Sequence, residues 1–187
     1  MFYTGKGDKG TTKLFKTNLG ERLSKSSDVF EALGTLDELN SFLGFCKVKL
    51  EKENFKIKRD NINLSELINI VQNNLFIIQA ELAGSEMRIT IEKIKEIENI
   101  INLIENELPE IKTFFVPGGT EIGSFLDISR AISRRAERKI IRISKKEKVL
   151  ITKNTKAYIN RLSSFLYALA RLVNYQSGIP EQPPNYK

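Results

Sequence analysis

Residues 28–50 read DVFEALGTLDELNSFLGFCKVKL, and the spacing of their apolar side chains decides the fold class. The apolar positions alternate steps of three and four residues, which places them on one face of a helix. These positions are Val29, Ala32, Leu36, Leu39, Leu43, Cys46 and Leu50. The stretch therefore predicts one long amphipathic helix, with Asp28 as its N-cap and Glu31 three residues later as the partner of a capping box.

Four further segments show the same helical period. They span residues 64–82, 91–108, 122–140 and about 157–175. Gly84 and Pro109 stop the first two of these segments, and Thr120 is the expected N-cap of the third. No segment alternates with period two for long enough to predict a strand. The pattern predicts an all-α, up-down bundle of five helices.

Length and composition restrict the possibilities further. The chain has 187 residues, of which 41% are hydrophobic, so we expect one domain over 1–187 with a glycine-rich segment 1–26 and a C-terminal tail 177–187. A single cysteine, Cys46, excludes an intramolecular disulfide, and its place on the apolar stripe predicts a core residue. The absence of histidine excludes Ser-His-Asp and Cys-His catalysis and imidazole-based zinc sites.

The charge and hydropathy of the chain bear on its partners. The net charge is +7, which suits either a solvated lysine-rich surface or binding to a polyanion, a nucleic acid or a membrane surface. The apolar runs are too short to span a bilayer, and the first residues show no secretory leader. The expected location is the cytoplasm, with no membrane partner.

The N-terminal segment contains GKGDKG at residues 5–10, which matches the spacing of a dinucleotide-binding fingerprint. That fingerprint requires a preceding strand and a following helix, and neither is predicted here. A Walker A loop also fails, because Gly10 is followed by Thr11 rather than lysine. The glycines, lysines and threonines suit either a polyphosphate cradle or a flexible terminus with turn glycines.

Two polar stripes lie on the last two predicted helices. The first consists of Asp127, Arg130, Arg134, Glu137 and Arg138, with Arg135 beside it, and the second consists of Asn160, Arg161, Ser164, Tyr167 and Arg171. Each stripe suits either a solvated helix face or a cleft in which arginines bind phosphate. Asp37 on the first helix is either an exposed carboxylate or a partner for one of these arginines.

Five blocks of sequence together resemble the propanediol-utilisation-type ATP:cob(I)alamin adenosyltransferases. They are residues 3–10 (YTGKGDKG), 30–41 (FEALGTLDELNS), 114–120 (FFVPGGT), 129–138 (SRAISRRAER) and 158–163 (YINRLS). The blocks follow the order of that family and span nearly the whole chain. Two positions depart from the family pattern: Asp127, where the family often has histidine, and Ser164, where it often has aspartate. The spacing between Phe15 and Lys25 is also longer than in relatives.

The resemblance implies a five-helix bundle that assembles as a homotrimer, with active sites between subunits. The implied ATP-binding residues are Thr4, Gly5, Lys6, Gly7, Thr12, Lys13, Lys25, Arg134, Arg135, Glu137, Arg138 and Asn160. Asp37 and Arg130 would form a salt bridge between subunits. Phe114 would lie on the corrinoid side and help to displace the lower axial ligand of cobalt.

The implied activity transfers the 5′-deoxyadenosyl group of ATP to the cobalt of cob(I)alamin and releases triphosphate. Mg²⁺ would accompany ATP, bound mainly through the phosphates. Further partners would be a cob(II)alamin reductase and an adenosylcobalamin-dependent enzyme, and no nucleic acid. The alternative is a non-catalytic nucleotide- or nucleic-acid-binding helical module, which would use the same basic face and show steep salt dependence.

Overall fold

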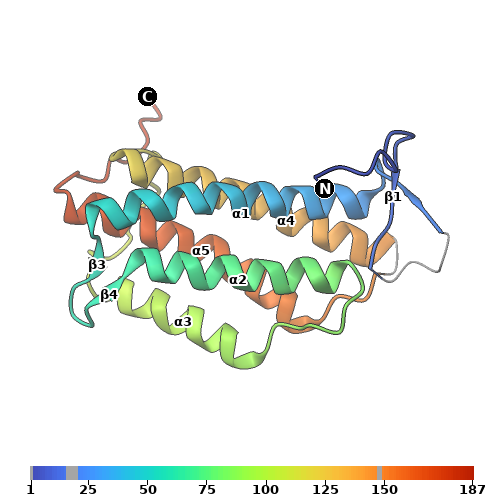
Figure 1. Ribbon diagram of the computed structural model, residues 1–187. Coiled ribbons are helices and arrows are strands. Elements are labelled where there is room, and N and C mark those ends of the chain that lie inside the picture. The colour runs from blue at the N-terminus through green and yellow to red at the C-terminus, as the bar shows by residue number, and fades with distance from the viewer. Residues whose placement is uncertain (1, 16–20, 147–148) are drawn as a thin grey trace.

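The computed structural model describes residues 2–15, 21–146 and 149–187. Its helices are α1 (Asp28–Glu53), α2 (Leu64–Leu82), α3 (Ile91–Glu105), α4 (Glu121–Lys146) and α5 (Lys153–Gln176). They lie side by side in an elongated bundle (Figure 1), in which α4 packs on α5 and α1, α1 on α2, and α3 on α5. The predicted all-α bundle of five helices is confirmed.

Two short antiparallel pairs of strands close the loops of the bundle. β1 (Thr11–Thr12) pairs with β2 (Leu23–Ser24), and β3 (Lys56–Ile57) pairs with β4 (Ile62–Asn63). Each strand has only two residues, which is too short to show as alternation in a sequence. The sequence indicates a longer spacing between Phe15 and Lys25 than in relatives. That spacing includes residues 16–20, which lie outside the described residues.

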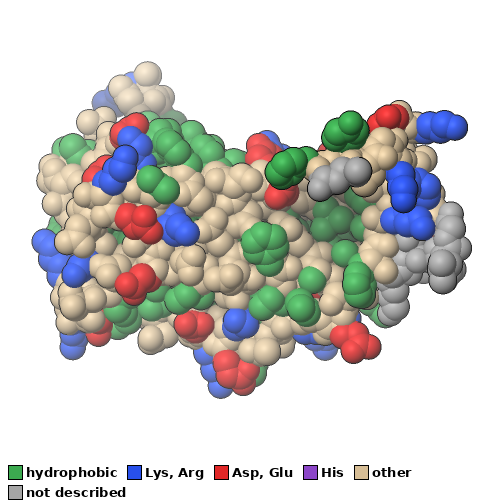
Figure 2. Space-filling view, in the orientation of Figure 1, with side chains coloured by type: hydrophobic (Ala, Val, Ile, Leu, Met, Phe, Trp, Pro, Cys, Tyr) green, Lys and Arg blue, Asp and Glu red, His purple; other side chains and the backbone are tan. Residues whose placement is uncertain are grey.

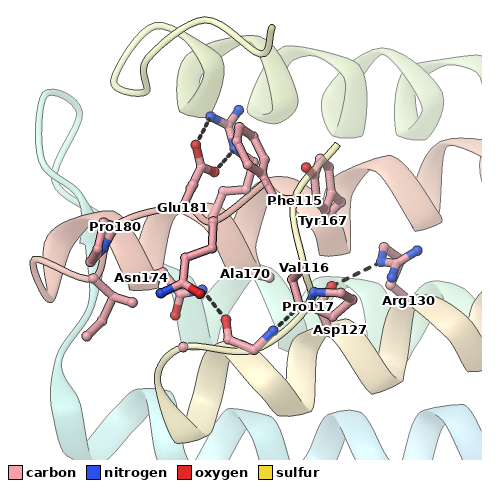
Figure 3. Close-up of a pocket in the computed structure, with 15 residues that line it drawn as sticks. Phe115, Val116, Pro117, Asp127, Arg130, Tyr167, Ala170, Asn174, Pro180 and Glu181 are labelled. Atoms are coloured by element: carbon pink, nitrogen blue, oxygen red, sulfur yellow. Dashed lines mark hydrogen bonds and ion pairs between the residues drawn. The ribbon is translucent and has the colours of Figure 1, made fainter. Parts of the chain in front are cut away.

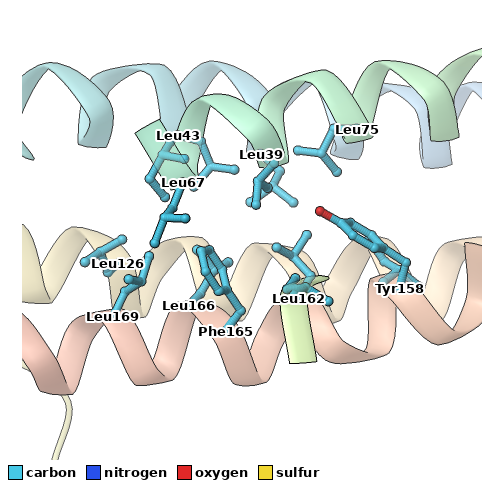
Figure 4. Close-up of a cluster of buried hydrophobic side chains, with 14 of the residues drawn as sticks. Leu39, Leu43, Leu67, Leu75, Leu126, Tyr158, Leu162, Phe165, Leu166 and Leu169 are labelled. Atoms are coloured by element: carbon cyan, nitrogen blue, oxygen red, sulfur yellow. The ribbon is translucent and has the colours of Figure 1, made fainter. Parts of the chain in front are cut away.

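The core is formed by the apolar stripes of the helices (Figure 4), and all seven predicted positions of α1 are buried. Cys46 is fully buried beside Ser129, and burial raises the pKa of its thiol, as expected for an inert core residue. On α3 the buried side chains are Ile94, Ile97, Ile100 and Ile104, and the helix ends at Glu105, three residues before the end of the predicted segment 91–108. None of the described helices is long and apolar enough to cross a membrane.

The two predicted N-caps had different outcomes. Thr120 caps α4 as predicted, since its Oγ1 accepts a hydrogen bond from the backbone N–H of Gly123 at 3.0 Å. The prediction that Asp28 caps α1 is wrong, because Ser27 occupies that position. The Asp28 carboxylate instead pairs with Lys146 at 3.0 Å and Arg142 at 3.2 Å, and these contacts lower its pKa. They join the start of α1 to the end of α4.

A buried polar pair links α2 to α5 within the core. The side-chain amide of Asn74 donates a hydrogen bond to the Tyr158 hydroxyl at 3.0 Å, and burial raises the pKa of Tyr158 to about 12. We expect Tyr158→Phe to lower the free energy of unfolding at pH 7 by about 1–3 kcal/mol, because the Asn74 amide would be buried without its acceptor.

The pH dependence of this difference provides a second check. Because the folded-state pKa lies above the unfolded value of 10.0, the contribution of Tyr158 is complete below pH 10 and is lost as the pH rises towards 12. Urea unfolding followed by circular dichroism should therefore show the two proteins converging in stability over this range. A difference that stays constant between about pH 9 and pH 11.5 would contradict the assignment.

Candidate functional site

The main groove of the molecule lies between α4, α5 and the loop that precedes α4. It has a volume of about 720 Å³, within the usual range for ligand sites. Its walls combine two arginines from α4, small polar and aromatic residues from α5, and the apolar and basic side chains of the loop. The lining residues are Ile111, Lys112, Thr113, Phe114, Phe115, Arg130, Arg134, Ser163, Ser164 and Tyr167.

Helical spacing brings the polar groups of the groove together. Arg130 and Arg134 lie one turn apart on α4, and Ser164 and Tyr167 lie one turn apart on α5. The two stripes predicted from the sequence therefore meet here in part. The two arginines of the α5 stripe have separate partners: Arg161 pairs with Glu98 of α3 at 2.8 Å, and Arg171 is buried against the C-terminal tail.

Arg130 is held in place by its neighbours. Its Nε lies 3.1 Å from Oδ1 of Asp127, and its guanidinium carbon lies 5.9 Å from the centre of the Tyr167 ring. The other oxygen of Asp127 accepts a hydrogen bond from Gly118 N at 3.3 Å (Figure 3). Asp127, one of the two departures from the family pattern, thus connects the arginine to the loop. Burial raises the pKa of Tyr167, so its hydroxyl stays protonated at neutral pH.

Arg134 and Arg138 project from α4 as exposed cations. Among the described residues, neither has an ion-pair partner, so both are available to an anionic ligand. Between them, Glu137 Oε1 accepts a hydrogen bond from the Asn160 amide at 2.9 Å, which joins α4 to α5. The structure therefore brings four predicted ATP-binding residues onto one surface ridge, called the arginine ridge below: Arg134, Glu137, Arg138 and Asn160. Arg135 points towards α1 instead, where it pairs with Glu38.

The N-terminal segment forms a compact turn. Gly5 and Gly10 adopt φ values of 66° and 73°, which side chains disfavour. A Cβ at Gly7 would lie 2.9 Å from the Lys25 Nζ, so glycine lets the lysine approach the loop. Lys25 N also donates to Gly10 O at 2.9 Å, which places the predicted lysine beside the predicted glycines.

Arg22 organises this turn, although no sequence signal pointed to it. Its Nε donates to Thr11 Oγ1 at 2.9 Å, and its Nη2 donates to the carbonyls of Lys6 at 2.7 Å and Thr11 at 2.6 Å. One guanidinium therefore holds both sides of the glycine loop. Thr4, Lys6 and Lys13 remain exposed on the same segment, as a ligand-facing role requires.

Among the described residues, no hydrogen bond or ion pair joins the glycine segment to Arg134 or Arg138. The segment lies at the end of the bundle where α1 begins and α4 ends, and its blue lysine and arginine side chains project there (Figures 1 and 2). Arg134 lies 12 residues before the last residue of α4, which corresponds to about 18 Å along the helix. Asp37 is exposed on α1 and, among the described residues, has no ion-pair partner within the chain.

A second, smaller cavity of about 180 Å³ lies between the loop before α4 and the C-terminal tail (Figure 3). The residues that shape it include Asn174 and Glu181, which sequence analysis did not single out. Each has the appearance of an ordinary polar side chain in the sequence, and its partners are 10 to 56 residues away in the chain. Only the packing of the tail against α5 shows what they contact.

The amino-acid sequence of this chain is similar to those of known proteins. Residues 2–173 match the sequence profile of the cobalamin adenosyltransferase family. The chain is 37% identical over 182 residues to the corrinoid adenosyltransferase of Bacillus subtilis, covering 95% of this chain and 88% of that protein. It is 36% identical to the corrinoid adenosyltransferase PduO of Citrobacter freundii, of which it spans only 50%.

Solved structures agree with the sequence comparison. A variant of the PduO-type ATP:corrinoid adenosyltransferase from Lactobacillus reuteri, complexed with cobalamin and ATP, superposes with a TM-score of 0.87 at 28% identity. That match covers 100% of this chain and 97% of the other. A second variant, complexed with ATP, gives a TM-score of 0.83 at 30% identity and covers 98% of this chain and 100% of the other.

The fold and the groove define a helical-bundle protein with a basic and aromatic groove between its last two helices. The chain belongs to the cobalamin adenosyltransferase family, as its five sequence blocks predicted.

Proposed function

We propose that this chain is an ATP:corrinoid adenosyltransferase that moves the 5′-deoxyadenosyl group of ATP to the cobalt of cob(I)alamin. The observation that carries the proposal is the groove that both Arg134 of α4 and Phe114 of the preceding loop line. Cationic donors on one side suit a triphosphate, and an exposed aromatic side chain on the other suits a corrin ring. Family membership supports the same activity.

The chemistry requires no histidine. Cobalt(I) donates an electron pair to C5′ of ATP, the Co–C bond forms, and the C5′–O bond breaks as its electrons leave with the triphosphate. The cobalt becomes formally Co(III). The corrinoid supplies the nucleophile, so the protein has to align C5′ with cobalt and stabilise the charge on the departing triphosphate.

The arginine ridge is suited to stabilising the charge on the departing triphosphate. Arg134 and Arg138 would contact the phosphates as fixed cations, and the Glu137–Asn160 pair would lie beside them. The described residues contain no cluster of three His, Cys, Asp or Glu side chains. Mg²⁺ commonly binds through substrate phosphates, water and one or two carboxylates, so Glu137 would supply the carboxylate of such a set.

We propose that the active site is completed by a neighbouring copy in a homotrimer. Among the described residues, no hydrogen bond or ion pair joins the glycine segment to Arg134 or Arg138 within one chain, so the segment of one protomer would cover the arginine ridge of the next. Asp37 of one copy would then pair with Arg130 of another, adding to the bond that Arg130 forms with Asp127. Backbone N–H groups and lysines of the glycine segment would contact the polyphosphate.

An exposed apolar patch on α1 and α4 supports this assembly. Phe45, Val48 and Ile128 are 45%, 46% and 47% exposed, although each is a large hydrophobic residue. The Phe45 ring packs on Phe125 with centroids 4.9 Å apart. Figure 2 shows hydrophobic side chains gathered along this upper edge of the molecule. Contiguous exposed apolar surface of this kind marks interaction sites.

We expect sedimentation equilibrium to give a mass of about three times the 21.4 kDa of one chain. Phe45→Glu should shift the protein to a smaller species and abolish adenosylation, because a charge in the centre of the patch opposes burial. Phe76→Glu, on an exposed side chain of α2, is the matched control and should keep the larger mass. An unchanged mass for Phe45→Glu would contradict this interface.

The decisive test of the activity is anaerobic incubation with ATP, Mg²⁺ and reduced cobalamin, followed by absorbance spectroscopy. The expected result is the spectrum of adenosylcobalamin with release of one triphosphate per corrinoid. A matched reaction without ATP should leave the spectrum of the reduced corrinoid unchanged. Failure to form the Co–C bond under these conditions would refute the proposed function.

A further inference from the structure

We propose that Arg171 and Glu181 are positioning residues that fix where Phe114 lies over the groove. They would do so by fastening the C-terminal tail and both ends of the 110–114 stretch to α5. The inference rests on the proposed function and extends it to a part of the chain outside the ATP and corrinoid contacts. Four observations carry it.

The first observation is that one buried guanidinium contacts three separate segments. The Arg171 side chain is only 6% exposed and forms a two-pronged pair with Glu181, in which Nη2 and Oε2 lie 2.9 Å apart. The same Nη2 donates to the carbonyl of Pro109 at 2.9 Å. Its guanidinium carbon lies 5.5 Å from the centre of the Phe115 ring. A buried charge needs such partners, which makes the arrangement specific.

The second observation is that the stretch between these anchors has no hydrogen bonds of its own. Among the described residues, none of 110–114 donates or accepts one, and the Phe114 side chain is 79% exposed. Pro109 and Phe115, at the two ends of the stretch, are both held by Arg171. Holding both ends of a short loop restricts the conformations open to the residues between them. The place of Phe114 therefore depends on these anchors.

The third observation is that the tail lies directly against the loop. Val116 N donates to the carbonyl of Gln182 at 2.8 Å. Gln182 directly follows Glu181, whose carboxylate pairs with the guanidinium of Arg171 (Figure 3). The tail thus contacts the loop by a backbone hydrogen bond and contacts α5 by an ion pair. Removing the Glu181 carboxylate would break the ion pair and should weaken the adjacent backbone hydrogen bond, since no other described side chain of 179–187 forms an ion pair.

The fourth observation is that the other side of the loop is held independently of the tail. Asn174 donates to Gly118 O at 2.7 Å and accepts hydrogen bonds from Thr120 N at 2.9 Å and Thr120 Oγ1 at 2.7 Å. A Cβ at Gly119 would lie 2.8 Å from this amide, so the contact is close. Loss of the tail should therefore loosen residues 110–116 without detaching the start of α4.

The step that responds to this placement is the reduction of cob(II)alamin. An aromatic wedge that displaces the lower ligand eases addition of the electron, whereas attack by cob(I)alamin that is already reduced needs no such displacement. A positioning role thus predicts lower turnover only in the reaction that starts from cob(II)alamin, with the KM for ATP unchanged. A purely structural role would lower both reactions together.

The test compares Glu181→Gln and a chain ending at Gly178 with a control chain ending at Gln182, which keeps the tail contacts. In Glu181→Gln and in the chain ending at Gly178, we expect faster amide hydrogen exchange in residues 109–117. We also expect a turnover from cob(II)alamin that is roughly tenfold lower. The electron paramagnetic resonance signal of cob(II)alamin lacking its lower ligand should weaken in parallel. The control chain should match the full-length protein in all three measurements.

Two outcomes would overturn the inference without touching the proposed function. One is unchanged exchange in residues 109–117 of Glu181→Gln in an enzyme that adenosylates normally. The other is faster exchange with equal losses from cob(II)alamin and cob(I)alamin, which would make the tail a structural element only. If the full-length chain forms no adenosylcobalamin at all, the proposed function fails and the positioning role fails with it.

Discussion

Arg134→Ala is expected to lower the turnover number by about 10²–10³-fold while the helical content stays unchanged. The side chain is exposed in the groove and, among the described residues, has no ion-pair partner. Its removal therefore leaves no buried group unsatisfied and should have little effect on folding. The expected loss comes from the charge that develops on the departing triphosphate, which a fixed guanidinium stabilises more than it stabilises bound ATP.

The measurement is anaerobic steady-state turnover with pre-reduced cobalamin, together with circular dichroism to verify the fold. Arg142→Ala is the matched control, because Arg142 is an exposed arginine further along α4 that pairs with Asp28 at 3.2 Å. It should retain nearly full activity. Near-normal turnover in Arg134→Ala would remove this arginine from the mechanism and would leave Arg138 as the main cation of the ridge.

Phe114→Ala is expected to slow the reaction from cob(II)alamin by roughly tenfold or more while affecting the reaction from cob(I)alamin much less. The ring is 79% exposed on the groove side of the loop, so its truncation leaves no core cavity. The asymmetry follows from the proposed role as a wedge. Only the reaction that begins with a five-coordinate cobalt needs its lower ligand removed before reduction.

Paired assays that share one ATP concentration and one reductant would measure this ratio directly. Phe76→Ala, which truncates an exposed phenylalanine of α2, is the matched control and should leave the ratio unchanged. Equal losses from the two corrinoid states would argue that Phe114 contributes to corrinoid binding in general. In that case the tail contacts at Arg171 would lose their proposed consequence as well.

The local sequence was sufficient to predict where the helices lie and which of their faces are buried. Residues 64–82 were predicted as a helix that stops at Gly84, and α2 spans Leu64–Leu82. The pattern worked because each helix buries a single stripe, so periodicity alone indicates its orientation. It failed at Asp28, because a carboxylate at the start of a helix suits either a cap or an ion pair with a distant helix.

The candidate site was predictable only in part. The sequence placed Arg134, Glu137 and Arg138 on one face of α4, and the structure brings that face to Asn160 of α5. Arg171 belonged to the polar stripe predicted on the last helix, yet its side chain is buried against the C-terminal tail. A polar stripe shows which side chains share a helix face, but the position of the tail depends on contacts between residues far apart in the chain.

The amino-acid sequence by itself determined the five-helix bundle, the buried stripes and, through five ordered blocks, the family. These properties depend on the spacing of residues within one segment, which a linear pattern records completely. Only the tertiary structure decided that Arg130 binds Asp127, that Arg22 holds the glycine loop and that Arg171 fastens the tail beside Phe114. Each of these bonds depends on the packing of separate segments, and an arginine finds its carboxylate or carbonyl partner only after that packing brings the two groups within hydrogen-bond distance.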